Sequence, residues 1–436
     1  MKLTIKNIGK ISESTIELKG ITVIAGENDT GKSTFGKILY SVFNSFFMID
    51  ERIKKERISS IIGTIFKKNF EDAQYVKYRK EIKQFITDIV DCEQDKDLLN
   101  LKINEFLQNY KSENIDIEKI SLEIKNIINI KKEDLFKNIL QKQLNFEFSD
   151  QINNIFFEEQ QAKIELTIKN KIMEVFIDKN KVSRFNNIQN LRTEVIYIDD
   201  TFILDKLGDS TYTTIESILC KGRPGKQQHS IHLLEKLDKN FKTITGIVDE
   251  TLLGEEQDDN VVNDILREKR INTILEKINN ICLGKLVVNK NSIKYEINPG
   301  VSFYLKNVST GIKTFIILKT LLQNGSLEEN GTIVLDEPEI HLHPEWQLLL
   351  AEIIVIMQKE LNLHVLINSH SPYFIWAIEV DSKKYKIQDK CRYYLTENMG
   401  KENKSFIVKD KTDNIKEIYD KLGIPFNKLE SEELEL

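Results

Sequence analysis

The chain has 436 residues, with 62 Lys and Arg against 68 Asp and Glu and a formal net charge of -6 at pH 7. Hydrophobic residues make up 40% and charged residues 30%, which is enough apolar material for a large core and excludes wholesale disorder and fibrous repeats. No apolar run reaches the roughly 20 residues that a membrane-spanning helix needs, so we expect no membrane partner. The mild acidity disfavours a uniformly basic surface but is compatible with a local basic groove for nucleic acid.

The N-terminus and the cysteines both favour a cytoplasmic protein. The first residues, MKLTIKNIGK, lack the apolar segment of a secretory signal. The four cysteines are far apart in the sequence and form no CxxC pair, as expected in a reducing compartment. The length corresponds to about three domains of ordinary size.

The first 45 residues predict strands followed by a helix. Alternating apolar residues begin at Leu3, and a continuous apolar run, Ile21–Ala25, stops at Gly26. After Lys32 the apolar residues recur at helical spacing, at Phe35, Ile38, Leu39 and Val42.

Two stretches in the middle of the chain, 46–144 and 206–284, predict mostly helices. In the first stretch, isoleucines at helical spacing form a short amphipathic seam, at Ile117, Ile120, Ile124 and Ile127. A packed helical hairpin and a short coiled-coil arm both fit this seam, and its small number of heptads favours the hairpin.

Strands are predicted between and after these helical stretches. Residues 162–178 alternate apolar and polar side chains across a central turn, as a β-hairpin does, and 193–198 predict a further strand. From residue 285 strands and helices alternate, and 385–408 predict a strand pair. Alternation of this kind indicates an α/β fold with a sheet covered by helices.

Residues 26–33, GENDTGKS, match the phosphate-binding pattern G-x-x-x-x-G-K-[ST] between a predicted strand and a predicted helix. The glycines let backbone N–H groups point at phosphate oxygens, and the helix N-terminus adds partial positive charge. The lysine of this pattern reaches the β- and γ-phosphates, and the hydroxyl that follows it ligates Mg²⁺. We therefore predict a catalytic Lys32, a Mg²⁺ ligand at Ser33, and ATP-binding residues Gly26, Asn28, Asp29, Thr30, Gly31, Lys32, Ser33 and Thr34.

An apolar strand at 332–335 ends in two adjacent acids, Asp336 and Glu337. Asp336 suits the acid that holds Mg²⁺ in a P-loop enzyme. Glu337 suits the catalytic group that polarises an attacking water. Solvated turn residues are the alternative, but the apolar strand and the upstream phosphate loop favour a catalytic pair.

The order of the motifs resembles that of the ABC-type ATPase superfamily. Residues 307–313 (NVSTGIK) lie where that superfamily has its signature loop, before the acidic strand. Residues 336–344 (DEPEIHLHP) resemble the combined Walker B motif and D-loop, and 368–372 (NSHSP) resemble the switch-histidine loop. The resemblance implies a P-loop ABC-type ATPase head, with a mixed sheet plus helices, that uses ATP and Mg²⁺.

The resemblance also implies a head-to-tail homodimer, or a higher oligomer, in which the signature loop of one subunit caps ATP bound by the other. Ser309, Thr310 and Gly311 would then contact the γ-phosphate in trans, and His370 would contact it within its own subunit as a catalytic residue. Two departures are Thr310 in place of the usual glycine and Ile312 in place of Gln or Glu. The candidates for a Q-loop glutamine are Gln160, Gln161 and Gln189.

The phosphate-binding pattern at 26–33 and the Walker B acids at 336–337 lie about 300 residues apart but must act on one nucleotide. The predicted head is therefore discontinuous in sequence. We predict that it comprises 1–45, 145–205 and 285–436, with projecting helical insertions at 46–144 and 206–284.

Within the superfamily, the DEPEIHLHP and SHSP motifs resemble the branch of RecF-like, SMC-like and overcoming-lysogenisation-defect ATPases, which includes the anti-phage ATPases of the Septu, Gabija and PARIS systems. Only the 64 residues 373–436 follow the last motif, too few for a separate nuclease domain of usual size. The resemblance favours a Septu-type ATPase that gates a separate effector, an HNH-type nuclease or a toxin. A DNA-repair clamp of the RecF or SMC type, and a toxin-control or signalling ATPase without a nucleic-acid ligand, stay open.

Two groups of basic residues are candidates for DNA contacts, although solvated helix faces explain them equally well. The histidines at 341, 343, 364 and 370 raise the alternative of a metal site, but no cysteine is close to them. His341 and His343 better suit the D-loop turn. The basic groups are Lys54, Lys55, Arg57, Lys67, Lys68, Lys77, Arg79 and Lys80, and then Lys221, Arg223 and Lys226.

Overall fold

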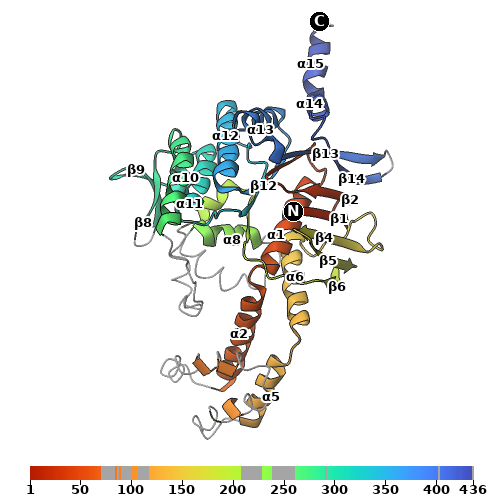
Figure 1. Cartoon of the computed structure of the whole chain (residues 1–436), viewed down its shortest axis with the longest axis vertical. Helices are drawn as coiled ribbons and strands as arrows, with labels where there is room; N and C mark the ends of the chain where they lie inside the picture. The colour runs from red at the N-terminus through yellow and green to blue at the C-terminus, as the bar shows by residue number, and fades with distance from the viewer. Residues whose placement is uncertain are drawn as a thin grey trace. The chain divides into compact units, whose positions relative to one another are not determined.

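The computed structural model describes residues 1–69, 84–85, 88–89, 101–103, 105, 117–207, 228–237, 261–289, 292–400 and 403–434 (Figure 1). The chain divides into two compact units. The larger unit comprises Met1–Asn44, Gln141–Ile188 and Thr193–Leu436, and the smaller unit comprises Ser45–Leu140 and Gln189–Arg192.

The larger unit is built on a mixed sheet, whose described strands are β1 (Lys2–Ile8), β2 (Ile11–Glu17), β3 (Ile21–Ala25), β4 (Ala162–Ile168), β5 (Lys171–Asp178), β6 (Lys181–Asn186), β7 (Val195–Ile198), β11 (Thr332–Asp336), β12 (His364–Ser369), β13 (Cys391–Gly400) and β14 (Asn403–Asp410). Their order across the sheet is β6-β5-β4-β1-β2-β14-β13-β3-β12-β11-β7. Strands β13, β3, β12, β11 and β7 run parallel, whereas β2, β1, β4, β5 and β6 pair antiparallel. This mixed sheet, covered by helices, confirms the predicted α/β class.

The parallel strands bring three predicted motifs to one edge of the sheet. Ala25 on β3 faces Ser369 on β12, and Asn368 faces Asp336 on β11. Because the carboxyl ends of parallel strands meet at the same edge, the loops that follow β3, β11 and β12 lie side by side. These loops contain the phosphate-binding pattern, the acidic pair and the predicted switch histidine.

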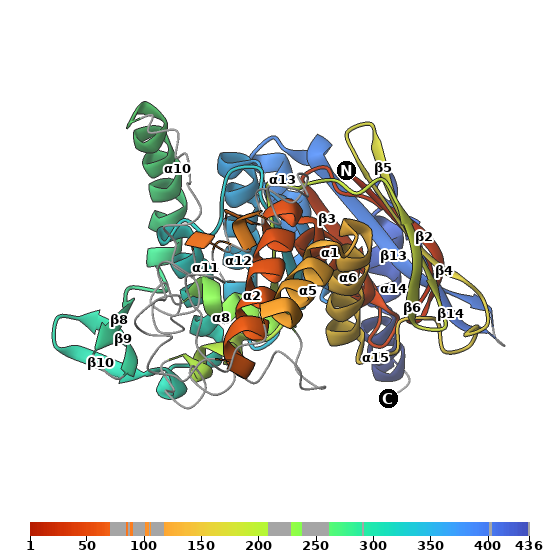
Figure 2. The ribbon, with the colours of Figure 1, turned by 90° about the horizontal axis from the view of Figure 1, so that it is seen from below.

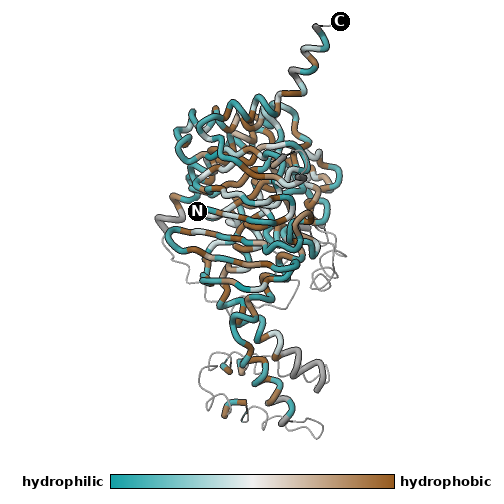
Figure 3. Tube along the Cα trace, turned by 90° about the vertical axis from the view of Figure 1, so that its right-hand side faces the viewer, coloured by the Kyte–Doolittle hydropathy of each residue, from teal (hydrophilic) through white to brown (hydrophobic). Residues whose placement is uncertain are grey.

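The pattern of burial reflects what covers each part of the sheet. Every residue of β3 is buried, as expected for a strand with helices on both faces. Along the antiparallel β4, buried residues alternate with half-buried ones, because successive side chains point to opposite faces. Figure 3 shows the corresponding alternation of hydrophobic and hydrophilic residues along the strands.

Helices cover both faces of the parallel strands. One core unites alternate strand residues with helices α8 (Gln228–Leu237), α10 (Val261–Asn279), α11 (Thr310–Gln323), α12 (Pro344–Leu361) and α13 (Pro372–Lys384). Figure 2 shows α10, α11 and α12 together, away from β4 and β5. Gly36 of α1 (Lys32–Phe46) lies against Val334 and Tyr197. These strand residues alternate with core residues, so α1 covers the opposite face.

The insertion at 206–284 was expected to project from the head, but its described helices contribute side chains to the core of the larger unit. Leu233 of α8 and Ile274 and Ile278 of α10 are buried in the core of the larger unit. The 3₁₀ helix η1 (Thr201–Lys206) leads toward this region, and its Ile203 joins the same core. Apolar side chains on both helices therefore make them part of the larger unit.

The C-terminal segment contributes strands to the middle of the sheet. The predicted strand pair forms β13 and β14, with β13 next to β3 and β14 next to β2. Helices α14 (Lys416–Leu422) and α15 (Ile424–Leu434) follow. A second, three-stranded sheet precedes α11, with strands β8 (Lys285–Asn289), β9 (Ser292–Asn298) and β10 (Val301–Tyr304) and then the 3₁₀ helix η4 (Leu305–Asn307).

The smaller unit contains α2 (Ile49–Asn69), α5 (Ile117–Ile128) and the start of α6 (Lys132–Phe148). The predicted isoleucine seam lies on α5, where Ile124 is buried. Arg57, one of the basic DNA-contact candidates, is buried rather than solvated and donates to the carbonyl of Ile130 at 2.8 Å. The candidates Lys77, Arg79, Lys80, Lys221, Arg223 and Lys226 lie outside the described residues, as do the side chains of Lys67 and Lys68.

Across the parts of the chain that the structure describes, no helix combines the length and the apolar character needed to span a membrane.

Candidate functional site

The phosphate-binding loop connects β3 to α1 and leaves no room for a side chain at Gly26. A Cβ there would lie 1.8 Å from Oγ1 of Thr396 on β13. The Thr396 hydroxyl donates to Oγ1 of Thr30 at 2.9 Å, and the Thr30 hydroxyl donates to the carbonyl of Glu27 at 2.8 Å. The C-terminal strand β13 therefore supports the phosphate-binding loop through the side chain of Thr396.

The turn of the loop depends on left-handed backbone conformations. Gly31 has a φ of 86° and Asp29 a φ of 66°, a region that glycine adopts without steric cost. The Asp29 carboxylate pairs with Lys10. Asn28 and Asp29 are exposed at the tip of the loop, where a ligand has access to them.

Lys32 begins α1 and is 4% exposed. Its ammonium donates to the carbonyls of Gly26 at 3.0 Å and Glu27 at 2.7 Å, and lies 3.6 Å from Oε1 of Glu337. Burial lowers the pKa of Lys32, and the charges of Glu337 and Asp336 oppose that shift. Ser33 is half-buried in the same first turn, and Thr34 is buried beside Gly9.

Asp336 is held by hydrogen bonds to both carboxylate oxygens. The Tyr197 hydroxyl on β7 donates to Oδ2 at 2.7 Å, and the Asn368 amide on β12 donates to Oδ1 at 3.0 Å. The register explains this arrangement, because β11 lies between β7 and β12. Burial, and then the charge of Asp336, raises the pKa of Tyr197, so its hydroxyl stays a donor.

Glu337 links the three loops at the edge of the sheet. Its backbone adopts a φ of 50°, and its N–H donates to the carbonyl of Asn368 at 2.9 Å. Its Oε1 lies 3.6 Å from Nζ of Lys32 and 3.4 Å from Nδ1 of His370. The structure thus brings together the predicted catalytic residues Lys32, Glu337 and His370.

A buried carboxylate, Glu339, holds the loop that contains His370. Its Oε1 accepts hydrogen bonds from the Ser369 hydroxyl at 2.5 Å and from the backbone N–H of His370 at 3.3 Å. Burial raises the pKa of Glu339 and the Ser369 bond opposes this shift. The Ser371 hydroxyl then caps α13 by accepting from the N–H of Phe374 at 3.3 Å.

The predicted signature residues lie at the start of α11. Ser309 occupies the N-cap position, is exposed, and makes no capping hydrogen bond with its side chain. Gly311 is buried against Trp346 and the backbone of His341. Among the described residues, no hydrogen bond or ion pair joins Ser309, Thr310 or Gly311 to the phosphate-binding loop of the same chain. One turn further, Lys313 is 2% exposed and lies 2.6 Å from Asp205 on η1.

A family model described as an AAA ATPase domain matches residues 1–375 of this chain. The chain belongs to the AAA ATPase domain family. The match extends from the phosphate-binding loop through the acidic pair to the switch loop. The protein is therefore an ATPase, in agreement with the coarse prediction from its motifs.

The ATPase is also similar, at 11% identity, to solved SMC head domains. The SmcHead bound to the C-winged helix domain of ScpA has a TM-score of 0.43, with 94% of this chain and 96% of that chain covered. The SMC head domain from Thermotoga maritima has a TM-score of 0.34, with 94% and 97% covered. An Smc head domain with an extended coiled coil, bound to the C-terminal domain of ScpA derived from Pyrococcus furiosus, has a TM-score of 0.39, with 94% and 95% covered.

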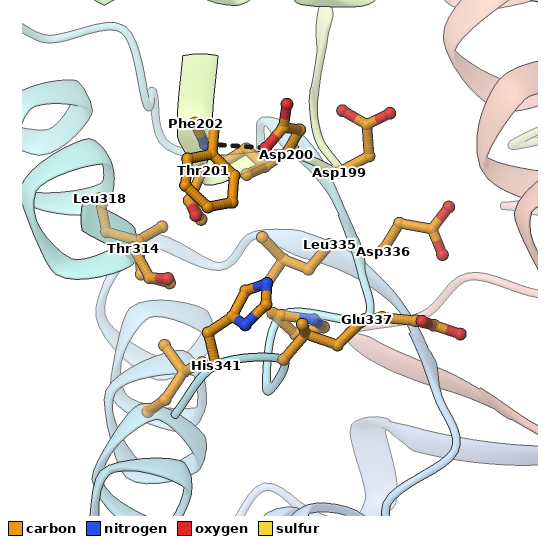
Figure 4. Close-up of a pocket in the computed structure, with 14 residues that line it drawn as sticks. Asp199, Asp200, Thr201, Phe202, Thr314, Leu318, Leu335, Asp336, Glu337 and His341 are labelled. Carbon is orange, nitrogen blue, oxygen red and sulfur yellow. Dashed lines mark hydrogen bonds between the residues drawn. The ribbon is translucent and has the colours of Figure 1, made fainter. Parts of the chain in front are cut away.

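A cavity of about 250 Å³ adjoins the acidic pair of the ATPase, beside η1 and α11 (Figure 4). Asp199 and Asp200, which follow β7, share this cavity with Asp336 and Glu337. The Thr314 hydroxyl in its wall is buried and has no hydrogen-bond partner within the described ranges. The cavity is continuous with the acidic pair and so belongs to the same site.

Other residues considered from the sequence have structural roles. The His343 ring caps α12 by accepting from the N–H of Glu345 at 3.4 Å, in keeping with a role in the turn. The side chain of Gln161 donates to Asp178 at 3.0 Å, and the carbonyl of Gln160 accepts from Asn7. In the described part of the chain, no group of three or more His, Cys, Asp or Glu side chains is arranged to hold a metal.

Sequence reasoning missed three residues of the ATPase site. Tyr197 and Thr396 lie inside predicted strands, and no motif marks them. Glu339 lies within the DEPE segment, so its position was visible although its contacts were not. Each of them contacts the site through residues more than 25 positions away in sequence, which a local pattern does not encode.

Proposed function

We propose that the ATPase hydrolyses ATP in a Mg²⁺-dependent reaction at the edge of the sheet where the loops after β3, β11 and β12 meet. The observation that carries this proposal is the position of the Glu337 carboxylate, 3.6 Å from Lys32 Nζ and 3.4 Å from His370 Nδ1. A base, a phosphate-binding cation and a γ-phosphate sensor are thus within reach of one substrate group.

Each side chain has a role in this proposal. Backbone N–H groups of the phosphate-binding loop, with Lys32, bind the β- and γ-phosphates. Glu337 orients a water and accepts its proton as the oxygen attacks the γ-phosphorus. The bond from that phosphorus to the bridging oxygen breaks, and ADP leaves with the electron pair. His370 donates to a γ-phosphate oxygen.

Ser33 and Asp336 would hold Mg²⁺, and their surroundings fit the ion. Two hydrogen bonds use only part of the acceptor capacity of the Asp336 carboxylate. Nearby, Oδ1 of Asn368 is buried without a hydrogen-bond partner among the described residues, as expected where a ligand or its water shell completes a site. When bound there, Mg²⁺ supplies positive charge that neutralises the phosphates.

We further propose that the complete site forms in a head-to-tail dimer. The exposed N-cap hydroxyl of Ser309 is not used by its own helix, and the N-terminus of a helix attracts phosphate. With Thr310 and Gly311 it would contact ATP bound to the partner subunit. This arrangement supports ATP-dependent association followed by separation after hydrolysis.

Two substitutions test the proposal. Lys32→Ala removes the buried cation and should abolish binding of a fluorescent ATP analogue. Glu337→Gln keeps the side-chain shape and should bind ATP, accumulate as a dimer in light scattering, and hydrolyse ATP at least about 100-fold more slowly. Glu345→Gln, an exposed acid on α12, is the matched control and should resemble the wild type. Rapid turnover by the Glu337→Gln protein would refute its assignment as the base.

For the biological role, we propose that the dimer gates a separate effector, a nuclease of the HNH type or a toxin, in bacterial anti-phage defence in the cytoplasm. The support is the resemblance of its DEPEIHLHP and SHSP motifs to anti-phage ATPases. The test is a pull-down with the ATP-bound Glu337→Gln protein, with mass spectrometry of the captured chains. Recovery of a nuclease or toxin supports the proposal. Binding to DNA alone at low salt would favour a DNA-repair clamp, and binding to neither would favour a signalling role.

A further inference from the structure

A tyrosine connects the proposed metal ligand to a buried charged cluster. The hydroxyl of Tyr197 donates to Oδ2 of Asp336 at 2.7 Å. The ring of Tyr197 stacks on the imidazole of His229 from α8, with centroids 4.4 Å apart and an interplanar angle of 25°. Tyr197 is 1% exposed, so surrounding side chains determine where its hydroxyl points.

The His229 imidazole lies between two carboxylates. Its Nδ1 lies 2.6 Å from Oε2 of Glu147 on α6, and its Nε2 lies 2.9 Å from Oδ2 of Asp199 after β7. The backbone N–H of His229 also donates to Oε1 of Glu147 at 3.0 Å. The ring is completely buried. Burial disfavours its charge, but the two carboxylates of Asp199 and Glu147 outweigh burial and raise the pKa of His229 to about 9.

Contacts on both edges fix the plane of this imidazole, and the stacked tyrosine ring must follow that plane. The Tyr197 hydroxyl is then aimed at one oxygen of Asp336 while Asn368 holds the other. Two donors on opposite oxygens prevent the carboxylate from rotating. Partners of this kind orient metal ligands, and their loss typically reduces metal affinity by about 10- to 100-fold.

We propose that Tyr197 is a positioning residue for the Mg²⁺-binding carboxylate of Asp336, and that the cluster of Glu147, His229 and Asp199 holds the Tyr197 ring in place. This inference rests on the proposed role of Asp336 and adds the residues that orient it. It also gives the buried side chains of Glu147 on α6 and His229 on α8 a direct connection to the nucleotide site.

The test measures the contribution of Mg²⁺ to nucleotide binding rather than turnover. The dissociation constant of a fluorescent ATP analogue is measured in EDTA and in Mg²⁺, and the ratio of the two values is compared between variants. Tyr197→Phe should leave the constant in EDTA unchanged and reduce the ratio by about tenfold. Tyr40→Phe is the matched control. Tyr40 is buried and its ring centroid lies 5.8 Å from that of the same His229, but among the described residues no hydrogen bond joins Tyr40 to Asp336. It should keep the wild-type ratio.

Asp336→Asn separates failure of this inference from failure of the proposed function. If Asp336→Asn keeps the wild-type ratio, the metal-binding role of Asp336 is wrong. If Asp336→Asn lowers the ratio and Tyr197→Phe does not, only the positioning role is wrong.

A second variant tests the buried cluster without touching Tyr197. Glu147→Gln keeps the shape of the side chain and weakens its hold on His229, so it should also lower the ratio. Combined with Tyr197→Phe it should lower the ratio no further, because both changes act through one hydroxyl. Fully additive effects in the double variant, or an unchanged ratio in Glu147→Gln, would overturn the assignment of the cluster.

Discussion

Because the imidazole of His229 is buried between two carboxylates, we expect the larger unit to lose stability as the pH rises above 6.5. The pKa of this ring is raised from 6.5 to about 9 in the folded protein. Below pH 6.5 the ring is protonated in both folded and unfolded chains, so the stabilisation is fully present. Between pH 6.5 and 9 only the folded chain keeps the proton, and stability therefore falls as the pH rises.

The size of the effect follows from the difference between these two pKa values. Each pH unit in that window changes the free energy of unfolding by about 1.4 kcal/mol. Over the whole window the loss is about 3 kcal/mol, a large part of the stability of an ordinary domain. The His229 ring is 0% exposed, so solvent does not screen its contacts with Glu147 and Asp199.

Urea unfolding followed by tryptophan fluorescence measures this loss. Both tryptophans of the chain, Trp346 and Trp376, lie in the larger unit, so the signal reports the unit that contains His229. The stability difference between wild type and His229→Gln should shrink by about 3 kcal/mol from pH 6.5 to pH 9.5. If the difference in free energy of unfolding between wild type and His229→Gln stays constant from about pH 6.5 to about pH 9.5, the imidazole is not held in its charged form by Glu147 and Asp199.

Two further substitutions test the loop contacts. Gly26→Ala places a Cβ 1.8 Å from the Thr396 hydroxyl. It should lower the free energy of unfolding by about 1–3 kcal/mol in thermal unfolding and weaken ATP binding. Adding Thr396→Ala should recover part of the loss, and fully additive effects of the two substitutions would contradict the clash. Lys313→Met breaks the 2.6 Å ion pair with Asp205 at the start of α11. It should preserve ATP binding by the monomer but reduce ATP-dependent dimerisation in light scattering. The control Lys359→Met, at an exposed site on α12, should preserve both ATP binding and dimerisation. Normal dimerisation of Lys313→Met would show that this pair does not orient the signature loop.

The phosphate-binding loop and the acidic pair could be predicted because their information is local. A run of apolar residues defines the strand before each loop, and the loop residues follow within a few positions. The parallel pairing of β3, β12 and β11 then brings Lys32, Glu337 and His370 together. The hairpin of β4 and β5 was likewise visible as a period of two.

Contacts between distant segments could not be predicted in this way. Thr396 lies on a C-terminal strand, and only its insertion beside β3 places its hydroxyl against Gly26 and Thr30. The helices from 206–284 carry amphipathic patterns that suit a projecting arm as well as a core. The burial of Ile274 in the core of the larger unit, where α10 packs on α11 and α12, decided between them.

By itself, therefore, the sequence determined an ATPase with a phosphate-binding loop and an acidic strand end, inside an α/β chain of modest negative charge. Only the tertiary structure decided which side chains orient those groups. Tyr197, His229 and Glu147 have no motif, because their effect depends on ring stacking and hydrogen bonds between β7, α8 and α6. Spacing along the chain encodes strands, helices and short loops, whereas the geometry between distant elements arises only when the sheet and its helices pack.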